Sequence, residues 1–419
     1  MRDRPRLWRS PLRGTRFTAV LGLVLLGGIT VLFVTGLVSY AAYNPDLSPV
    51  NDTTPDKGLL GFYLFAWPAG PSWLYRLTQG VHVTLGVTLV PVLLAKLWSV
   101  VPKLFALPPA RSLAHALERL SLLLLVGGGL FEFTTGLLNI QLEYVFPGSF
   151  YPLHFYGAWV FLSAFVVHAA LKTPVAVRSL RAVGSPREGE RERTAAGRPV
   201  DEAGLASARP AEPTVSRRGA LRLVGASSLL LFLTTVGQSL GGPLRRTALL
   251  APHGGADPGG GPNGFQINKT AAYAGITESE TSEDAWRLVV TGPAGTVRLA
   301  RADLLRLPQH SSSLPIACVE GWSTADQWWR GVRLRDLAAL AGYDTGAVDL
   351  LVESLQRHGA FRRAALRANQ VSDPRSLLAL YVNGEPLSLD HGYPARIIVP
   401  ALPGVHNTKW VARLTFGDL

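Results

Sequence analysis

The sequence predicts a membrane α-helical bundle of four spans plus a fifth anchor helix, followed by an α+β domain outside the membrane. The first observation is the hydrophobic content of 47%, with a positive mean hydropathy, which few soluble proteins reach. The second is a set of five apolar stretches of about 20 residues, the length that crosses a bilayer. The third is a change, from Trp286 onward, to short strands and helices separated by turn residues.

The five apolar stretches cover residues 17–40, 79–100, 115–140, 153–172 and 223–240. Arginine is abundant before the first stretch and between the fourth and the fifth, whereas the loops 41–78 and 141–152 carry few basic residues. Because cytoplasmic loops are enriched in Lys and Arg, we expect the N-terminus and the linker inside, and everything after about residue 242 outside. All five stretches obey this one orientation.

The net positive charge of the chain also bears on its partners. The formal net charge is +12, which raises nucleic acid as a partner. The basic residues are concentrated in the loops described above, so we expect a membrane and no nucleic acid. The chain has one cysteine, which excludes an internal disulfide.

The expected organisation has six parts. They are a cytoplasmic basic N-terminus (1–16), a four-helix membrane domain (17–175), a disordered cytoplasmic linker (176–222), a fifth transmembrane helix (223–241), a flexible tether (242–264) and an extracytoplasmic domain (265–419). Within the last part, residues 288–291 and 296–299 flank a Gly-Pro-Ala-Gly turn and predict a hairpin. Residues 301–307 and 333–340 predict helices, and residues 396–400 predict a strand.

Cys318 begins the run Cys-Val-Glu-Gly-Trp-Ser at residues 318–323. A lone cysteine in such a mixed segment is usually a small buried hydrophobic residue. Three further blocks follow it, at residues 383–387 (NGEPL), 391–400 (HGYPARIIVP) and 407–410 (NTKW). The order and spacing of these blocks resemble the sulfite-oxidase family of molybdopterin enzymes over about residues 265–419. The resemblance is strongest to the bacterial branch that includes periplasmic protein-methionine-sulfoxide reductase, whose cysteine motif is Cys-Val-Glu-Ala-Trp-Ser.

The resemblance implies that Cys318 is the catalytic cysteine and binds molybdenum, for which a soft thiolate is a suitable ligand. Its other implications concern molybdopterin. Arg396 and Lys409 would face the phosphate of the cofactor, since a guanidinium and an ammonium both suit phosphate. Further contacts to the pterin or its phosphate are implied for Ser354, His391, Asn407 and Thr408. Residues 268–273 match the family poorly.

The linker ends in a Ser-Arg-Arg sequence at residues 216–218, followed by the fifth stretch. This sequence resembles a twin-arginine export signal, with Ala220 where a large apolar residue is usual. The resemblance has a purpose, because a molybdenum cofactor is inserted in the cytoplasm and the loaded domain must then cross the membrane folded. The alternative is an ordinary anchor with basic residues on its inner side.

Histidines in the apolar stretches predict haem b, as in cytochrome b-type membrane subunits. His82 and His154 lie at similar depth on the outer side, and we expect them to ligate one haem iron. His168 lies 14 residues beyond His154, about 21 Å along a helix and about 40° around it. His115 is its expected partner for an inner haem. The alternative is a set of interfacial histidines without iron.

Glu132 is an intramembrane carboxyl within the third stretch. Such a group is a functional hypothesis by default, here as a proton path or a contact to quinol. The alternative is that its side chain reaches the outer membrane surface.

These patterns favour a membrane-bound oxidoreductase of the bacterial cytoplasmic membrane. Electrons would pass between quinone or quinol, haem b and an extracytoplasmic molybdenum site. Oxygen-atom transfer there would reduce an S-oxide or a similar substrate, either a small molecule or a protein side chain. The alternatives are a sulfite-like oxidase that works in the opposite direction and a membrane-tethered binding module without catalysis.

Overall fold

The computed structural model describes residues 15–47, 50–51, 65–104, 112–140, 150–181, 215–251, 258–344 and 348–419. The chain divides into two compact units. The first comprises Met1–Phe33, Leu85–Leu137 and Leu153–Leu233, and the second comprises Val34–Thr84, Leu138–Pro152 and Thr234–Leu419. The sequence-based division placed residues 17–175 in one domain, whereas the structure groups residues 34–84 with the C-terminal domain.

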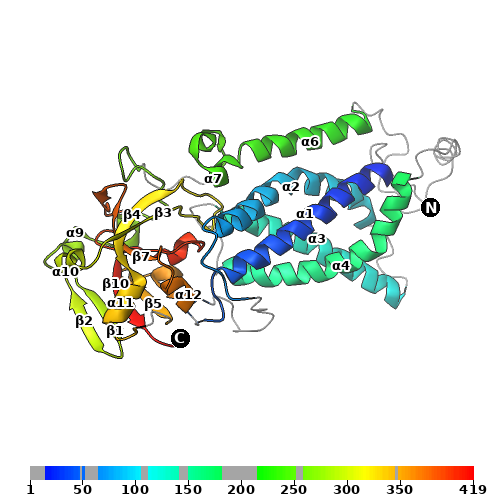
Figure 1. The fold of residues 1–419 in the computed structure, drawn as a ribbon. Coiled ribbons are helices and arrows are strands. Elements are labelled where there is room, and N and C mark those ends of the chain that lie inside the picture. Colours follow the sequence, from blue (N-terminus) through cyan, green and yellow to red (C-terminus); the bar gives the residue numbers. More distant parts are fainter. Residues whose placement is uncertain are drawn as a thin grey trace, which may run out of the picture. The chain divides into compact units, whose positions relative to one another are not determined.

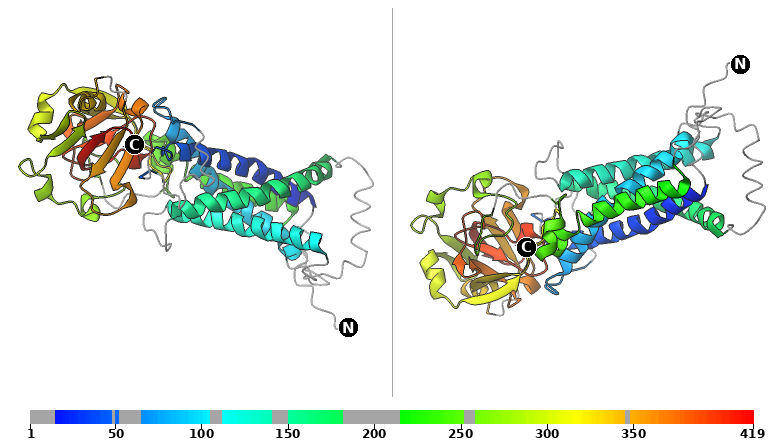
Figure 2. Two further views of the ribbon diagram at one scale, coloured as in Figure 1. Left: turned by 90° about the horizontal axis from the view of Figure 1, so that it is seen from below. Right: turned by 90° about the horizontal axis from the view of Figure 1, so that it is seen from above.

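The first unit is helical, and its long helices run side by side (Figures 1 and 2). Within the described residues, five helical segments are long and apolar enough to cross a membrane. These segments are Arg16–Ala41, Leu74–Val101, Arg119–Asn139, Pro152–Arg178 and Arg217–Leu240. The helices that contain them are α1 (Thr15–Ala41), α2 (Leu74–Leu104), α3 (Leu113–Asn139), α4 (Phe150–Arg181) and α6 (Arg217–Leu233), with the short α7 (Gly237–Leu240) after α6.

Spacing along α1 explains how the first unit packs. Phe17, Leu21, Leu25 and Ile29 recur every four residues, so they form one stripe on the helix. The stripe is buried against residues of α2 and α4, namely Leu89, Val92, Leu93 and Phe161. The helices also expose apolar side chains, which suits a surface that faces lipid.

The helix boundaries differ from the predicted ones at three places. The helix α2 begins at Leu74, five residues before the predicted start. The helix α4 continues to Arg181 with Pro174 inside it, so the first residues of the predicted linker are helical. The predicted fifth span is interrupted, because α6 ends at Leu233 and a turn precedes α7. Residues 182–214 of the predicted linker lie outside the described residues.

The second unit holds the α+β domain, which confirms that part of the predicted fold. Its helices are η1 (Gly242–Thr247), α8 (Ala271–Ala274), α9 (Glu278–Thr281), α10 (Arg301–Arg306), α11 (Leu334–Leu340), η2 (Ala360–Arg362), α12 (Ala368–Val371) and η3 (Gly404–His406). Its strands are β1 (Leu288–Gly292), β2 (Gly295–Leu299), β3 (His310–Leu314), β4 (Gln327–Arg333), β5 (Leu350–Ser354), β6 (Arg363–Leu366), β7 (Leu377–Val382), β8 (Glu385–Pro386), β9 (Arg396–Ile398) and β10 (Val411–Phe416). The predicted hairpin is present as β1 and β2, which pair antiparallel.

The strands form two sheets (Figure 1). The first has the order β2-β1-β10-β5-β6, in which only the β1–β10 pair is parallel. The second has the order β3-β4-β7-β8, with β9 also paired to β7. Buried strand residues such as Leu288, Leu350 and Leu414 form the main core together with Leu334 and Leu337 of α11. Both sheets therefore present rigid strand ends to the loops that hold the site.

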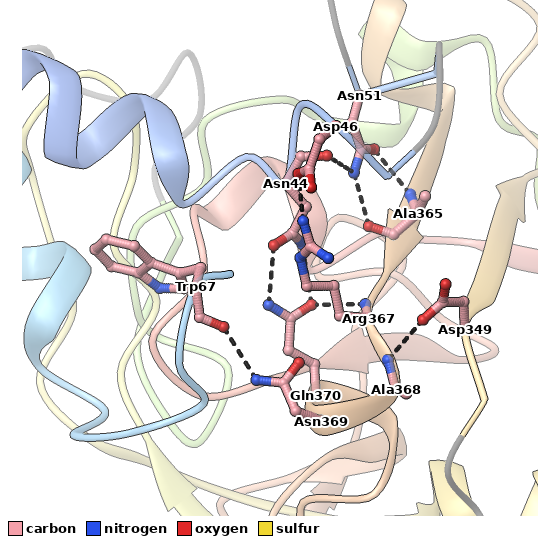
Figure 3. Close-up of polar contacts among 10 residues, drawn as sticks. All are labelled: Asn44, Asp46, Asn51, Trp67, Asp349, Ala365, Arg367, Ala368, Asn369 and Gln370. Atoms are coloured by element: carbon pink, nitrogen blue, oxygen red, sulfur yellow. Dashed lines mark hydrogen bonds and ion pairs between the residues drawn. The ribbon is translucent and has the colours of Figure 1, made fainter. Parts of the chain in front are cut away.

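The segment between α1 and α2 is part of the second unit. Asn44 and Gln370 exchange two amide hydrogen bonds, of 3.0 and 3.2 Å, and both side chains are buried (Figure 3). Asn51 makes the same reciprocal arrangement with the backbone of Ala365, at 2.8 Å in each direction. Asn51 thus extends the exposed edge of β6 in the way that another strand would.

Trp67 adds an apolar anchor to this segment. Its ring is fully buried, and its indole nitrogen donates to the carbonyl of Ala401 at 2.7 Å. Its own carbonyl accepts from Asn369 at 3.0 Å (Figure 3). Asp46 forms an ion pair with Arg367. We call the contacts made by Asn44, Asp46, Asn51 and Trp67 the polar clamp. They join the α1–α2 segment to β6, α12 and the Ala401 loop.

The described parts of the predicted flexible tether at 242–264 make defined contacts. Residues 242–247 form η1, and Asn263 is tied to the domain. The side chain of Asn263 accepts from Ser388 N at 2.9 Å and donates to the carbonyl of Pro386 at 3.2 Å. Composition alone indicated flexibility, but these bonds fix the chain next to the site. Residues 252–257 of the tether lie outside the described residues.

Candidate functional site

Cys318 lies in a tight turn between β3 and β4. The turn is closed by hydrogen bonds from Cys318 N to the carbonyl of Trp322 at 2.8 Å and from Gly321 N to the carbonyl of Cys318 at 3.1 Å. Gly321 has a φ of +89°, a conformation that glycine adopts without strain. Ala317 bridges to Ser323 and to Pro403, so the turn is anchored at its base. The result is a single buried thiol held on a fixed backbone.

The thiol has two polar neighbours. Its proton points toward a carboxylate oxygen of Glu320 at 3.6 Å, and the amide nitrogen of Asn268 lies 3.8 Å from the sulfur. The indole of Trp322 donates to the same Glu320 oxygen at 2.6 Å and so fixes that carboxyl group. Burial, followed by the nearby charge of Glu320, raises the pKa of the Cys318 thiol. A bound metal ion would replace the thiol proton.

Three basic side chains gather near this turn. The guanidinium of Arg396 is buried and donates to the carbonyls of His391 and Asn407, at 3.0 and 3.2 Å. The ammonium of Lys409 donates to the carbonyls of Lys269 and Asp390, at 2.6 and 2.8 Å. The third side chain, Lys269, contacts the amide oxygen of Gln356 at 2.9 Å. We call Arg396, Lys409 and Lys269 the cation cluster.

The electrostatics of the cation cluster indicate an anionic ligand. Burial lowers the pKa of Lys409 to about 7 and that of Arg396 to about 9, and the charge of Arg396 contributes to the shift of Lys409. Burial also lowers the pKa of Lys269. In the part of the chain that the structure describes, no carboxylate forms an ion pair with any of the three. Buried cations are normally paired, so a bound anion would supply the missing partner.

Two buried polar atoms give a second, independent sign of the same ligand. Arg396 Nε and the hydroxyl of Thr408 are buried and have no hydrogen-bond partner among the described residues. Buried donors without partners are rare in folded proteins, and a bound ligand can supply the acceptor that they lack. A phosphate accepts from both a guanidinium and a hydroxyl. The residues present therefore fit the phosphate of a pterin cofactor beside Cys318.

The structure uses three of the predicted contact residues to build the site. The hydroxyl of Ser354 donates to the carbonyl of Lys409 at 2.7 Å. The amide oxygen of Asn407 accepts from Val399 N at 2.9 Å. His391 stacks on Phe265 with ring centroids 3.8 Å apart, and its Nε2 lies 2.8 Å from the carbonyl of Asn263. These contacts position the backbone around the cation cluster.

The charge state of His391 follows from its surroundings. Burial, followed by the charge of Arg396, lowers the pKa of His391 to about 3. The ring is therefore neutral at ordinary pH and adds no positive charge to the cation cluster.

Sequence reasoning missed three residues of this site. Asn268 and Lys269 belong to the segment that matches the family poorly, yet the structure places them beside Cys318 and the cation cluster. The sequence motif contains Glu320 but assigns it no contact, whereas the structure places its carboxylate 3.6 Å from the Cys318 sulfur. Lys269, which lies just before helix α8, could have been used as a signal for the site, because a lysine inside a domain needs a partner.

The histidines predicted to bind haem share a local arrangement. In the second unit, Nδ1 of His82 lies 3.3 Å from the hydroxyl of Thr35, and a Cβ atom added at Gly36 would lie 3.0 Å from the His82 ring. In the first unit, Nδ1 of His154 lies 3.1 Å from the hydroxyl of Thr135, and Gly136 follows that threonine. Each imidazole is thus oriented through Nδ1 by a Thr-Gly pair on a neighbouring helix.

Glu132 also contacts His154, with its carboxylate oxygen 3.1 Å from Nδ1. The Glu132 side chain is buried within the protein. His168 lies on α4 together with His154, as predicted. His115 lies in α3, but its side chain is outside those that the structure describes.

The α+β fold, the buried thiol and the cation cluster together offer a sulfur ligand for a metal and a positively charged site for an anionic group. Comparison with known proteins identifies that domain. Residues 274–418 match the family model of the oxidoreductase molybdopterin-binding domain. Mitochondrial sulfite oxidase of Rattus norvegicus is 31% identical over 158 residues, which cover 32% of this chain and 29% of that protein. The uncharacterized oxidoreductase YuiH of Bacillus subtilis is 33% identical over 132 residues, which cover 31% of this chain and 65% of that protein.

One solved structure is also similar. The sulfane dehydrogenase SoxCD of Paracoccus pantotrophus is 27% identical, with a TM-score of 0.30, over 33% of this chain and 39% of that chain. The C-terminal part of this chain therefore carries an oxidoreductase molybdopterin-binding domain that is similar to sulfite oxidase and to YuiH. The chain spans less than a third of rat sulfite oxidase and about two thirds of YuiH, and the matches lie in its C-terminal part.

Proposed function

We propose that the whole chain is a membrane-bound molybdopterin-dependent oxidoreductase that exchanges electrons between the quinone pool and an extracytoplasmic molybdenum site through haem b. The observation that carries the proposal is the cation cluster near the buried thiol of Cys318: Arg396 is buried, and no member of the cluster forms an ion pair with a carboxylate among the described residues. A buried guanidinium with two further cations beside it favours an anion that joins them.

The side chains have distinct roles in this proposal. The thiolate of Cys318 binds the metal, and its turn keeps the sulfur at a fixed position. Arg396 and Lys409 bind the phosphate of molybdopterin, and Thr408 donates to it. When bound, the cofactor supplies two-electron oxygen-atom transfer, which none of the side chains of this domain performs by itself.

Haem b extends the proposal into the helices. His82 and His154 are the proposed outer ligands, and His168 with His115 the proposed inner ligands. The Thr35 and Thr135 hydroxyls at Nδ1 support the outer pair, because a histidine that binds metal usually gives its other nitrogen to a hydrogen-bond acceptor. A neutral ring oriented in this way coordinates iron through Nε2. Glu132, next to His154, is the proposed proton path or quinol contact.

The membrane topology and the export route are also proposals. The five apolar helical segments and the distribution of arginine support a multi-pass protein of the bacterial cytoplasmic membrane, with its catalytic domain on the extracytoplasmic side. Arg217 and Arg218 begin α6, where a twin-arginine signal would precede its apolar region. Export by the twin-arginine machinery would carry the domain across with its cofactor already inserted.

The preferred reaction is reduction of an S-oxide or a similar substrate, because a haem-containing membrane part is suited to deliver electrons from quinol. Oxidation is the second candidate. It is favoured by the mitochondrial sulfite oxidases among the similar proteins. The two reactions use the same site and differ in the direction of electron flow.

The test begins with metal and pterin analysis of the purified full chain, followed by turnover with S-oxides and N-oxides under a soluble reductant. Sulfite and an electron acceptor provide the opposite assay. We expect about one molybdenum per chain and faster turnover in the reductive assay. Purified chain without molybdenum or pterin, from cells that make the cofactor, would contradict the proposal. Turnover only with sulfite would establish the second candidate.

A further inference from the structure

The turn that holds Cys318 is covered on one side by the first turns of α2. The side-chain amide of Gln79 donates to the carbonyl of Val319 at 2.5 Å. A Cβ atom added at Gly321 would lie 2.7 Å from Cβ of Val83, so the helix and the glycine backbone are in direct contact. Gln79 and Val83 are four residues apart and lie on one face of α2. This face therefore touches the residue next to Cys318 and the residue three positions after it.

The other side of the same turn is held by α7. The hydroxyl of Ser239 donates to the carbonyl of Gly321 at 2.6 Å, and the hydroxyl of Ser323 donates to the carbonyl of Ser239 at 2.8 Å. Ser323 N donates to the carbonyl of Gln238 at 2.9 Å. These bonds leave the turn little freedom to move away from α2.

His82 is the covalent neighbour of Val83 on α2. A continuous route therefore runs from the His82 backbone to Val83, across the contact with Gly321, and along the hydrogen bond from Gly321 N to the carbonyl of Cys318. All of these residues belong to the second unit. Gln79 adds a parallel hydrogen-bonded branch through the carbonyl of Val319.

We propose that this contact is the electron bridge between the haem site at His82 and the molybdenum site at Cys318. The proposal rests on the proposed function and names its internal route. With haem bound and electrons supplied by quinol, the haem would deliver electrons one at a time, and this contact would carry them from α2 to the turn. Two crossings and two protons convert one S-oxide into the sulfide and water. Gln79 and Val83 act as positioning residues that keep the two sites in contact.

The test uses the double variant Gln79→Leu with Val83→Ala in the full chain. The control is Val87→Ala, which removes the same two methyl groups as Val83→Ala, one helical turn further along α2. Three quantities are measured: the visible spectrum of the reduced haem, turnover of an S-oxide with a soluble reductant, and the rate at which added S-oxide reoxidises the prereduced haem. We expect the double variant to slow haem reoxidation several-fold, with its haem spectrum and soluble-reductant turnover unchanged. The control should match the wild-type chain in all three.

Val83→Ile provides a second variant, since its larger side chain retains the contact with the turn and should keep fast reoxidation. Unchanged reoxidation in the double variant would overturn the bridge while leaving the proposed function intact. Equal losses of haem reoxidation and soluble-reductant turnover would also overturn it, because the contact would then serve the molybdenum site alone. A wild-type chain without haem would instead refute the haem part of the proposed function, and the bridge with it.

Discussion

The polar clamp and the cation cluster are both buried polar regions of the second unit, but they satisfy their polar groups differently. In the polar clamp, Asn44 and Gln370 pair with each other and Asn51 pairs with the backbone of Ala365. In the cation cluster, the hydrogen bonds that Arg396 and Lys409 donate within the described residues all go to backbone carbonyls, and burial lowers the pKa of each.

This difference separates a structural contact from a binding site. The paired amides of the polar clamp satisfy each other and gain nothing from a ligand, whereas a buried guanidinium without a carboxylate favours an anion strongly. Substitutions in the two regions should therefore affect different measurements. Substitutions that remove contacts of the polar clamp should lower stability, and substitutions that remove a charge of the cation cluster should lower cofactor content.

The largest expected effect is at the metal ligand beside the cation cluster. Cys318→Ser should abolish turnover, because a hydroxyl is a poor replacement for a soft thiolate ligand. The variant should still fold, since the turn is closed by backbone hydrogen bonds that a serine retains. Turnover is measured with a soluble reductant, and folding by the melting temperature. Full activity in this variant would exclude Cys318 as the ligand.

The second effect is loss of cofactor from the cation cluster. Lys409→Met and Arg396→Met each remove a charged hydrogen bond to the proposed phosphate, of about 1.5–3 kcal/mol, which corresponds to about tenfold or more in affinity. Pterin content after purification measures the loss. Gln370→Leu in the polar clamp is the control and should keep full pterin content. Retention of the pterin in both cluster variants would remove the reason to place the phosphate there.

The third effect is confined to stability. Gln370→Leu leaves the buried amide of Asn44 without its partner and should lower the free energy of unfolding by about 1–3 kcal/mol. The double variant Asn44→Leu with Gln370→Leu should recover part of this loss, because no unpaired side-chain amide remains; both variants lose the bond from Arg367 N to Gln370 Oε1. Melting temperatures of the full chain in detergent measure both changes. The single variant Asn44→Leu completes the comparison. If the loss of melting temperature in the double variant equals the sum of the losses in Asn44→Leu and Gln370→Leu, the bond between the two amides is not the source of the effect.

The pH dependence of stability should depend on whether the cofactor is bound. Burial lowers the pKa of Lys409 from 10.5 to about 7. Between these values the unfolded chain binds more protons than the folded chain, so the free energy of unfolding of the cofactor-free protein should rise with pH, by at most about 1.4 kcal/mol per unit. A bound phosphate keeps Lys409 protonated and should flatten this rise. Melting temperatures from pH 7 to pH 9 with and without cofactor test it, and equal slopes would contradict it.

The smallest effect is expected at Ser354. Its hydroxyl holds the carbonyl of Lys409, so Ser354→Ala should lower the free energy of unfolding by about 1 kcal/mol. Pterin content should fall only slightly, because the ammonium of Lys409 keeps its two carbonyl acceptors. A loss of pterin as large as that of Lys409→Met would instead indicate that Ser354 contacts the cofactor directly.

Much of the fold followed from local patterns in the sequence. Apolar length located α1, α3 and α4, and a Gly-Pro-Ala-Gly turn between β-branched runs located β1 and β2, because both features act over short distances. Cys318 and the cation pair Arg396 and Lys409 were found through motif spacing. Cys318 and Arg396 are buried, and their roles as ligands stay predictions.

The parts that could not be predicted depend on contacts between distant residues. The segment with Asn44, Asn51 and Trp67 reads as a polar outer loop, and nothing local shows that it meets residues more than 300 positions later. Asn263 lies in a Gly- and Pro-rich stretch that composition assigns to a flexible tether. Its bonds to Ser388 and Pro386 are equally non-local. Such pairings are invisible to periodicity, which reports only neighbours along the chain.

The polar clamp has a consequence for the order of biogenesis. Its two halves leave the ribosome far apart in time, since the α1–α2 segment is made long before α12. Contacts with such sequence separation form late, after both partners are in place. If the C-terminal domain is exported already folded, the α1–α2 segment is a prebuilt receptor on the far side of the membrane. Docking onto it would then be the final step of maturation, and a chain with a damaged segment would accumulate as an inserted but unassembled precursor.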